Sequence, residues 1–84
     1  MDTQTEKTFR TSDLHLIAFL MTQDCKVERL DKSATRTFFY FLDLPRCEQL
    51  HKDFINGNDQ VSARAYSGAI RNAKDLINAQ KRAA

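Results

Sequence analysis

The sequence predicts a small α+β domain of two layers, with elements in the order helix, β-hairpin, helix, helix. Three observations predict this class. A nearly continuous apolar segment follows Thr11, strand-like alternation rich in aromatic residues extends to Leu42, and an amphipathic helical pattern fills the last third of the chain. An isolated two-stranded hairpin is marginally stable in water, so we expect the hairpin to pack on the helices.

Length and composition allow one soluble domain. The chain has 84 residues and a formal net charge of +2, which is too close to balance to require an anionic partner. We expect a disordered lead over residues 1–8, one α+β domain over residues 9–78 and a frayed tail over residues 79–84. No apolar run approaches the ~20 residues of a membrane span, and two cysteines are too few for a disulfide scaffold. We therefore expect a cytoplasmic protein with reduced thiols and no membrane contact.

The first helix is expected to begin at Thr11, Ser12 or Asp13, each of which can cap a helix, and to run to Met21. Its apolar side chains cover an arc of roughly 200°, which indicates packing on two sides, by the sheet and by another helix. Phe19 projects near the polar sector of this helix.

The hairpin is expected to pair residues 25–30 with residues 35–42 across a turn at residues 31–34. Simple alternation puts Val27 and Arg29 on one side of the first strand. The second strand is apolar on both faces, with one set of aromatic side chains on each. The first set is Phe39 and Phe41, and the second is Phe38, Tyr40 and Leu42.

Two helices follow the hairpin. The first has Asp43 or Leu44 as its N-cap and Pro45 in its first turn, and it ends at Asn56-Gly57-Asn58. Its expected apolar side consists of Cys47, Leu50, Phe54 and Ile55. The last helix begins after Ser62 and should stay docked to about Ile77. Its expected apolar stripe consists of Ala65, Tyr66, Ala69, Ile70, Ala73, Leu76 and Ile77.

Several of these segments together resemble a small family of uncharacterised bacterial proteins, a domain of unknown function. The resemblance runs from Phe9 to about Ile77, and its segments are the Thr-Ser-Asp-Leu start at residues 11–14, Ala18-Phe19-Leu20, the aromatic strand ending in Asp43, Phe54-x-Asn56-Gly57, Ala63-Arg64-Ala65-Tyr66 and Ala69-Ile70-Arg71. Residues 25–34 depart most from the family pattern. The resemblance implies the order of the elements and no activity.

Candidate sites for chemistry are weak. Thr11, Ser12 and Asp13 have no catalytic context, so they are interpreted as caps, with an anion site at the helix start as the alternative. Cys47 and His51 have metal-compatible i,i+4 spacing but no second ligand pair, so neither a metal nor a cofactor is expected. We therefore expect a protein that is not an enzyme.

Two surfaces could bind a macromolecule. A basic face of the last helix, formed by Arg64, Arg71, Lys74, Lys81 and Arg82, would contact nucleic-acid phosphates unless it is an ordinary solvated face. Alternatively, Phe38, Tyr40 and Leu42 would meet a second copy of the chain unless helices cover both faces of the strand. We expect a non-catalytic binding or assembly module whose partner is a second copy of the chain, in a homodimer, or another protein. Nucleic-acid binding and anion or nucleotide binding are the alternatives.

Overall fold

The computed structural model describes residues 8–58 and 60–83, with side chains through residue 79. The elements are β1 (Phe9–Thr11), α1 (Leu14–Thr22), β2 (Val27–Lys32), β3 (Thr37–Phe41), α2 (Leu44–Ile55) and α3 (Ala63–Ala83). The predicted α+β class and the order helix, hairpin, helix, helix are confirmed. The structure adds the strand β1, and the predicted lead falls on residues 1–7, outside the described range, and on Thr8.

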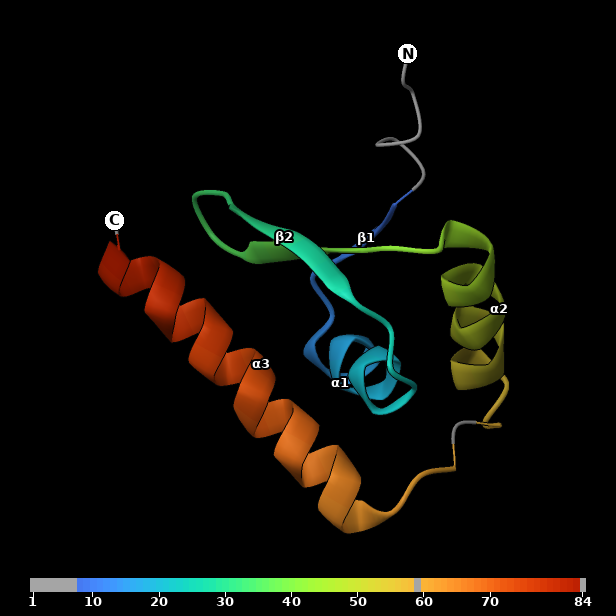
Figure 1. The fold of residues 1–84 in the computed structure, drawn as a ribbon. Helices are drawn as coiled ribbons and strands as arrows, with labels where there is room; N and C mark the ends of the chain where they lie inside the picture. Colours follow the sequence, from blue (N-terminus) through green and yellow to red (C-terminus); the bar gives the residue numbers. More distant parts are fainter. Residues whose placement is uncertain (1–7, 59, 84) are drawn as a thin grey trace.

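The sheet has three antiparallel strands in the order β1-β3-β2, with all three helices on one side of it (Figure 1). The aromatic strand β3 is therefore central, and both of its edges are paired. Phe39 lies opposite Thr11 of β1 and Leu30 of β2, and Phe41 lies opposite Phe9 and Val27. This register sends Phe39 and Phe41 towards the helices.

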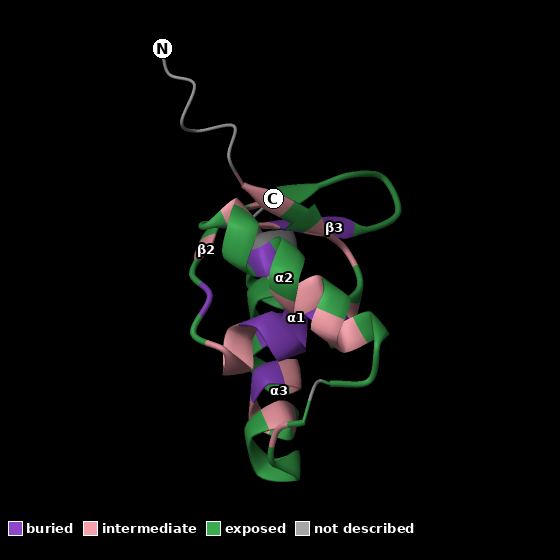
Figure 2. Ribbon diagram, turned by 90° about the vertical axis from the view of Figure 1, so that its right-hand side faces the viewer, coloured by how far each residue is buried: buried purple, intermediate pink, exposed green. Residues whose placement is uncertain are grey.

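The core lies between the sheet and α1. Phe39, Phe41, Leu20 and Cys47 have no exposed surface, and Ile17 is 1% exposed. Burying a large apolar side chain contributes about 1.5–3 kcal/mol, so this cluster supplies most of the stability of a thin domain. Among the described elements, helix α1 holds the most buried residues, and it is largely coloured as buried in Figure 2.

Helix α1 is enclosed on three sides, by the sheet, α2 and α3 (Figure 1). The packing on two sides or more that its wide apolar arc predicted is confirmed. The prediction for Phe19 is wrong, because this side chain is only 3% exposed and its ring lies 5.7 Å from that of Phe54 in α2. A third covering element was not predicted. Helix α2 covers the side of α1 that carries Phe19, which was expected to be polar and exposed.

Simple alternation along β2 is also wrong. A β-bulge interrupts the register between Val27 and Arg29, so Val27 pairs with Phe41 on the inward side and Arg29 pairs with Tyr40 on the outward side. A bulge adds one residue to a strand and thereby reverses the facing of everything beyond it. The turn also comes later than predicted, since the Ser33 amide donates to the Arg36 carbonyl at 2.8 Å.

The ends of α2 follow the predicted signals. Asp43 caps its start in a left-handed conformation with φ of 67°, and Gly57 ends it with φ of +81°. The Asn58 amide donates back to the Asp53 carbonyl at 2.7 Å, a bond that satisfies a helix-end carbonyl. Ile55 is wrongly assigned to the apolar side of this helix, because it is the last residue of α2 and is 67% exposed.

Helix α3 packs along α1, and its two buried residues among the described side chains are alanines. Ala73 is fully buried and Ala69 is 7% exposed, whereas Leu76, expected in the stripe, is 39% exposed and Ala65 is also exposed. The buried stripe of α3 is therefore narrower than predicted. The backbone remains helical to Ala83, past the docked region predicted to end near Ile77.

Candidate functional site

The face of the sheet that points away from the helices carries two aromatic side chains. Phe38 and Tyr40 lie two residues apart on β3, so they share one face, and each is half-buried. All three described helices lie against the opposite face (Figure 1). The alternative in which helices cover both sides of the aromatic strand therefore does not hold for the described residues.

An arginine from each neighbouring strand lies over one of these rings. The guanidinium carbon of Arg10, on β1, is 4.5 Å from the centroid of the Phe38 ring. The guanidinium carbon of Arg29, on β2, is 3.8 Å from the centroid of the Tyr40 ring. Both distances are within the range of a cation–π interaction. Within the described part of the chain, no carboxylate lies within ion-pair distance of either guanidinium group.

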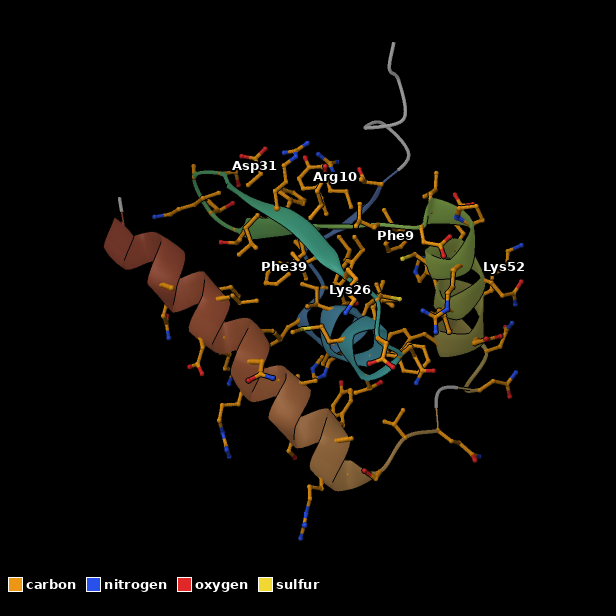
Figure 3. All side chains as sticks on the ribbon, viewed as in Figure 1. Phe9, Arg10, Lys26, Asp31, Phe39 and Lys52 are labelled. Carbon is orange, nitrogen blue, oxygen red and sulfur yellow. The ribbon has the colours of Figure 1, made fainter. Side chains whose placement is uncertain are left out.

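Asp31 completes the surface that we call the outer face, which consists of Arg10, Arg29, Asp31, Phe38 and Tyr40. Asp31 is the partner of Phe38 in the register, and Figure 3 shows it with Arg10 on the side of the sheet opposite Phe39. The outer face thus combines two flat rings, two cations and one anion. Its charge is positive, and its positive groups contact rings instead of acids.

Sequence reasoning found the rings of this face and missed the arginines. Phe38 and Tyr40 belong to the predicted self-association set, but Leu42 follows the end of β3, where it is 44% exposed and its amide donates to the Lys26 carbonyl. Arg10 lies on a strand too short to show periodicity. The bulge places Arg29 on the face of the sheet opposite to Val27, whereas simple alternation had placed both on one side. A signal did exist, since Phe9-Arg10-Thr11 alternates apolar and polar residues directly before a helix cap.

The candidate anion site at the start of α1 is filled by the chain itself. The Asp13 carboxylate accepts from the His15 amide at 3.0 Å and from the Leu16 amide at 3.4 Å. The Thr11 hydroxyl accepts from the Asp13 amide, and the Ser12 hydroxyl accepts from the Arg36 guanidinium. The interpretation of these residues as caps is confirmed for Asp13, whose negative charge opposes an incoming anion.

The predicted basic face of α3 is partly described. Arg64, Arg71 and Lys74 are all exposed, and Asp75 is exposed beside them. Lys81 and Arg82 belong to α3, but their side chains lie outside the described residues. Among the described side chains, no aromatic ring lies under Arg64, Arg71 or Lys74, so the basic face remains a prediction based on charge alone.

The two cysteines lie together in the core as free thiols. Burial raises the pKa of the Cys47 thiol to about 12, and the neighbouring Cys25 adds to the effect. The Cys47 thiol donates to the Leu42 carbonyl at 3.4 Å, and the Arg46 guanidinium lies 3.8 Å from the Cys25 sulfur. This environment favours the protonated thiol of Cys47, which is a poor nucleophile and metal ligand.

The two histidines make packing contacts instead of approaching each other. The ring of His51 lies 5.5 Å from that of Phe9, edge to face, and joins α2 to β1. His15 Nδ1 is 2.6 Å from the Tyr66 hydroxyl and joins α1 to α3. Among the described residues no group of three or more His, Cys, Asp or Glu side chains could hold a metal ion.

The fold and the outer face together define a small α+β domain in which the described helices cover one face of the sheet and no described element covers the other. The chain belongs to a family described as a domain of unknown function (DUF5659), whose model matches residues 6–79. The match confirms that the chain belongs to a family of unknown function, as its resemblance implied. A comparison with curated proteins gave no match, and neither did one with solved structures. None of the described helices is long and apolar enough to cross a membrane.

Proposed function

We propose that this protein is a non-catalytic binding module and that it binds an anionic macromolecule through the outer face of its sheet. The observation that carries the proposal is the pair of guanidinium groups, Arg10 and Arg29, held over the rings of Phe38 and Tyr40 without a carboxylate partner in the described chain. Arginines placed in this way keep their hydrogen-bond donors available to an anion. The two free thiols fit a protein that works in the reducing cytoplasm.

A second copy of the chain fits this face less well. Two outer faces packed together would bury four guanidinium groups against only two Asp31 carboxylates, and unpaired buried charge is costly. Strand addition is disfavoured too, because β3 is central and the two edge strands are poor templates. The free edge of β2 carries a bulge and the charged residues Glu28 and Lys32, and β1 has only three residues. The homodimer is therefore our second candidate, and the same experiments test it.

The proposal is tested by elution of the full chain from heparin, an anionic polymer, in a salt gradient. One variant carries Arg10→Gln and Arg29→Gln on the outer face. The matched control carries Arg64→Gln and Arg71→Gln on α3, so both variants lose two positive charges. We expect the outer-face variant to elute at clearly lower salt than the wild type and the control to shift little.

Two results would overturn the proposal. The first is elution of the wild type without retention at low salt. The second is an equal shift for the two variants, which would mean that net charge and not the outer face decides binding. Light scattering on the same samples tests the homodimer. If the wild type is a dimer and the outer-face substitutions dissociate it, the outer face is a self-association surface.

A further inference from the structure

We infer that the anionic partner is single-stranded nucleic acid, with bases stacked on Phe38 and Tyr40 and phosphates bound by Arg10 and Arg29. This inference rests on the proposed function of the outer face and adds the chemical class of the partner. Its basis is the coupling of flat rings with cations, which a ligand carrying charge alone would not use.

The rings are placed to receive successive bases. Phe38 and Tyr40 are two residues apart on a central strand, which separates them by about 6.6 Å along β3. Both belong to a strand paired on each side, so their positions are fixed by the sheet and little conformational entropy is lost on binding. Stacking on such side chains tolerates any base, because every base has a π face.

The arginines are placed to change partners. In the free protein each guanidinium group lies over a ring, where an exposed cation–π contact is weak. A base that stacks on the ring takes the place of the guanidinium group, which can then form a charge-assisted hydrogen bond with a neighbouring phosphate. Arg10 and Arg29 come from opposite sides of β3, so phosphates on both sides of the stacked bases are within their reach.

Other anionic partners use only part of this surface. In a duplex the bases are already stacked on one another, so Phe38 and Tyr40 would gain nothing from it. An acidic peptide or a sulfated polysaccharide satisfies the two arginines and leaves the rings unused. Asp31 lies opposite Phe38, and its negative charge weakens the binding of every polyanion. A ligand that also stacks on the rings offsets this repulsion, whereas a ligand held by charge alone does not.

The test measures fluorescence anisotropy of labelled oligonucleotides of about 12 nucleotides, a length within the usual site sizes for single strands. The probes are oligo-thymidylate, oligo-uridylate and a DNA duplex of equal length. We expect both single strands to bind more tightly than the duplex. Equal affinity for DNA and RNA is expected as well, since stacking and phosphate contacts do not involve the 2′-hydroxyl.

The variants separate stacking from charge. Phe38→Leu and Tyr40→Leu should each weaken single-strand binding by about 5- to 100-fold and leave heparin elution unchanged. The double variant Arg10→Gln, Arg29→Gln should reduce the slope of log affinity against log salt by about 1.4, because two phosphate contacts are lost. Asp31→Asn should strengthen binding of all polyanions. Circular dichroism confirms folding of each variant.

A second measurement does not depend on variants at the binding rings. The chain has no tryptophan and two tyrosines, Tyr40 and Tyr66, so Tyr66→Phe leaves Tyr40 as the only tyrosine emitter. We expect oligo-thymidylate to quench this emission and heparin to leave it unchanged. Quenching by both ligands, or by neither, would overturn the stacking arrangement.

The two proposals fail in different ways. If duplex, single strand and heparin bind equally and the leucine variants change nothing, the nucleic-acid inference is wrong and the anionic-partner proposal stands. If no polyanion binds, both are wrong. If oligonucleotides bind but the α3 variant Arg64→Gln, Arg71→Gln alone abolishes binding, the outer face is not the site and both are again wrong.

Discussion

Neighbouring phenylalanines on β3 have opposite surroundings. Phe39 is fully buried against α1, whereas Phe38 lies on the outer face under the Arg10 guanidinium group. The sequence predicted this division, because alternation along a strand allows no other, but it could not say which set faces the helices. The choice depends on tertiary packing, and a shift of one residue would reverse it.

This difference predicts unequal costs of truncation. Phe39→Ala should lower the free energy of unfolding by about 3–5 kcal/mol, because it removes a buried ring and leaves a cavity. Phe38→Ala should cost about 1 kcal/mol, since it removes a half-buried ring and one exposed cation–π contact. Urea denaturation of both variants measures the difference, and similar midpoints would show that the facing of β3 is wrong.

The raised pKa of the Cys47 thiol predicts a loss of folding stability at alkaline pH. The pKa of its thiol is about 12 in the folded protein because of burial, against 9.0 for an unperturbed thiol in water. Above pH 9 the unfolded chain therefore loses a proton that the folded chain keeps, and unfolding becomes easier as the pH rises towards 12. The expected slope is at most about 1.4 kcal/mol per pH unit.

The measurement compares urea denaturation at pH 7.5 and pH 10 for the wild type and for Cys47→Ala. The variant starts from lower stability because it loses packing, but its stability should depend less on pH than that of the wild type. Titrations of groups that do not interact with Cys47 are common to both proteins and cancel in the comparison. The same pH dependence in both proteins would contradict the assigned environment of Cys47.

Among the elements, the helices were more predictable than the sheet. Asp13 and Asp43 cap α1 and α2 where the sequence placed cap candidates, and Gly57 ends α2. Caps are local, so a few neighbouring residues specify them. The strand β1 has three residues and the bulge in β2 depends on pairing with β3, so neither has a local pattern. Both missed outer-face arginines, Arg10 and Arg29, lie at these two features.

Ser62 gives a test of capping at the start of α3. Its hydroxyl accepts from the Ala65 amide at 3.0 Å. Ser62→Ala should lower the free energy of unfolding by about 1 kcal/mol, because a first-turn amide loses its partner. Ser67→Ala, at an exposed position inside the same helix, is the matched control and should be neutral or slightly stabilising. Thermal unfolding of both variants checks this, and equal effects would contradict the cap.

At the scale of the whole molecule, all described helices lie on one side of a three-stranded sheet (Figure 1). The sequence predicted the two layers but left open whether both faces of the aromatic strand are covered. That question is decided by where α2 and α3 dock, and both dock around α1. The consequence is a sheet face with rings and cations that none of the described helices covers, and the sequence had indicated only its rings.

The most direct test of this face is a titration of the ¹⁵N-labelled protein with oligo-thymidylate, followed by amide chemical shifts. If the outer face is the binding surface, the largest changes will fall on the amides of Arg10, Arg29, Phe38 and Tyr40 and their strand neighbours, with α3 unaffected. Changes centred on Arg64, Arg71 and Lys74 of α3, or no changes at all, would contradict it.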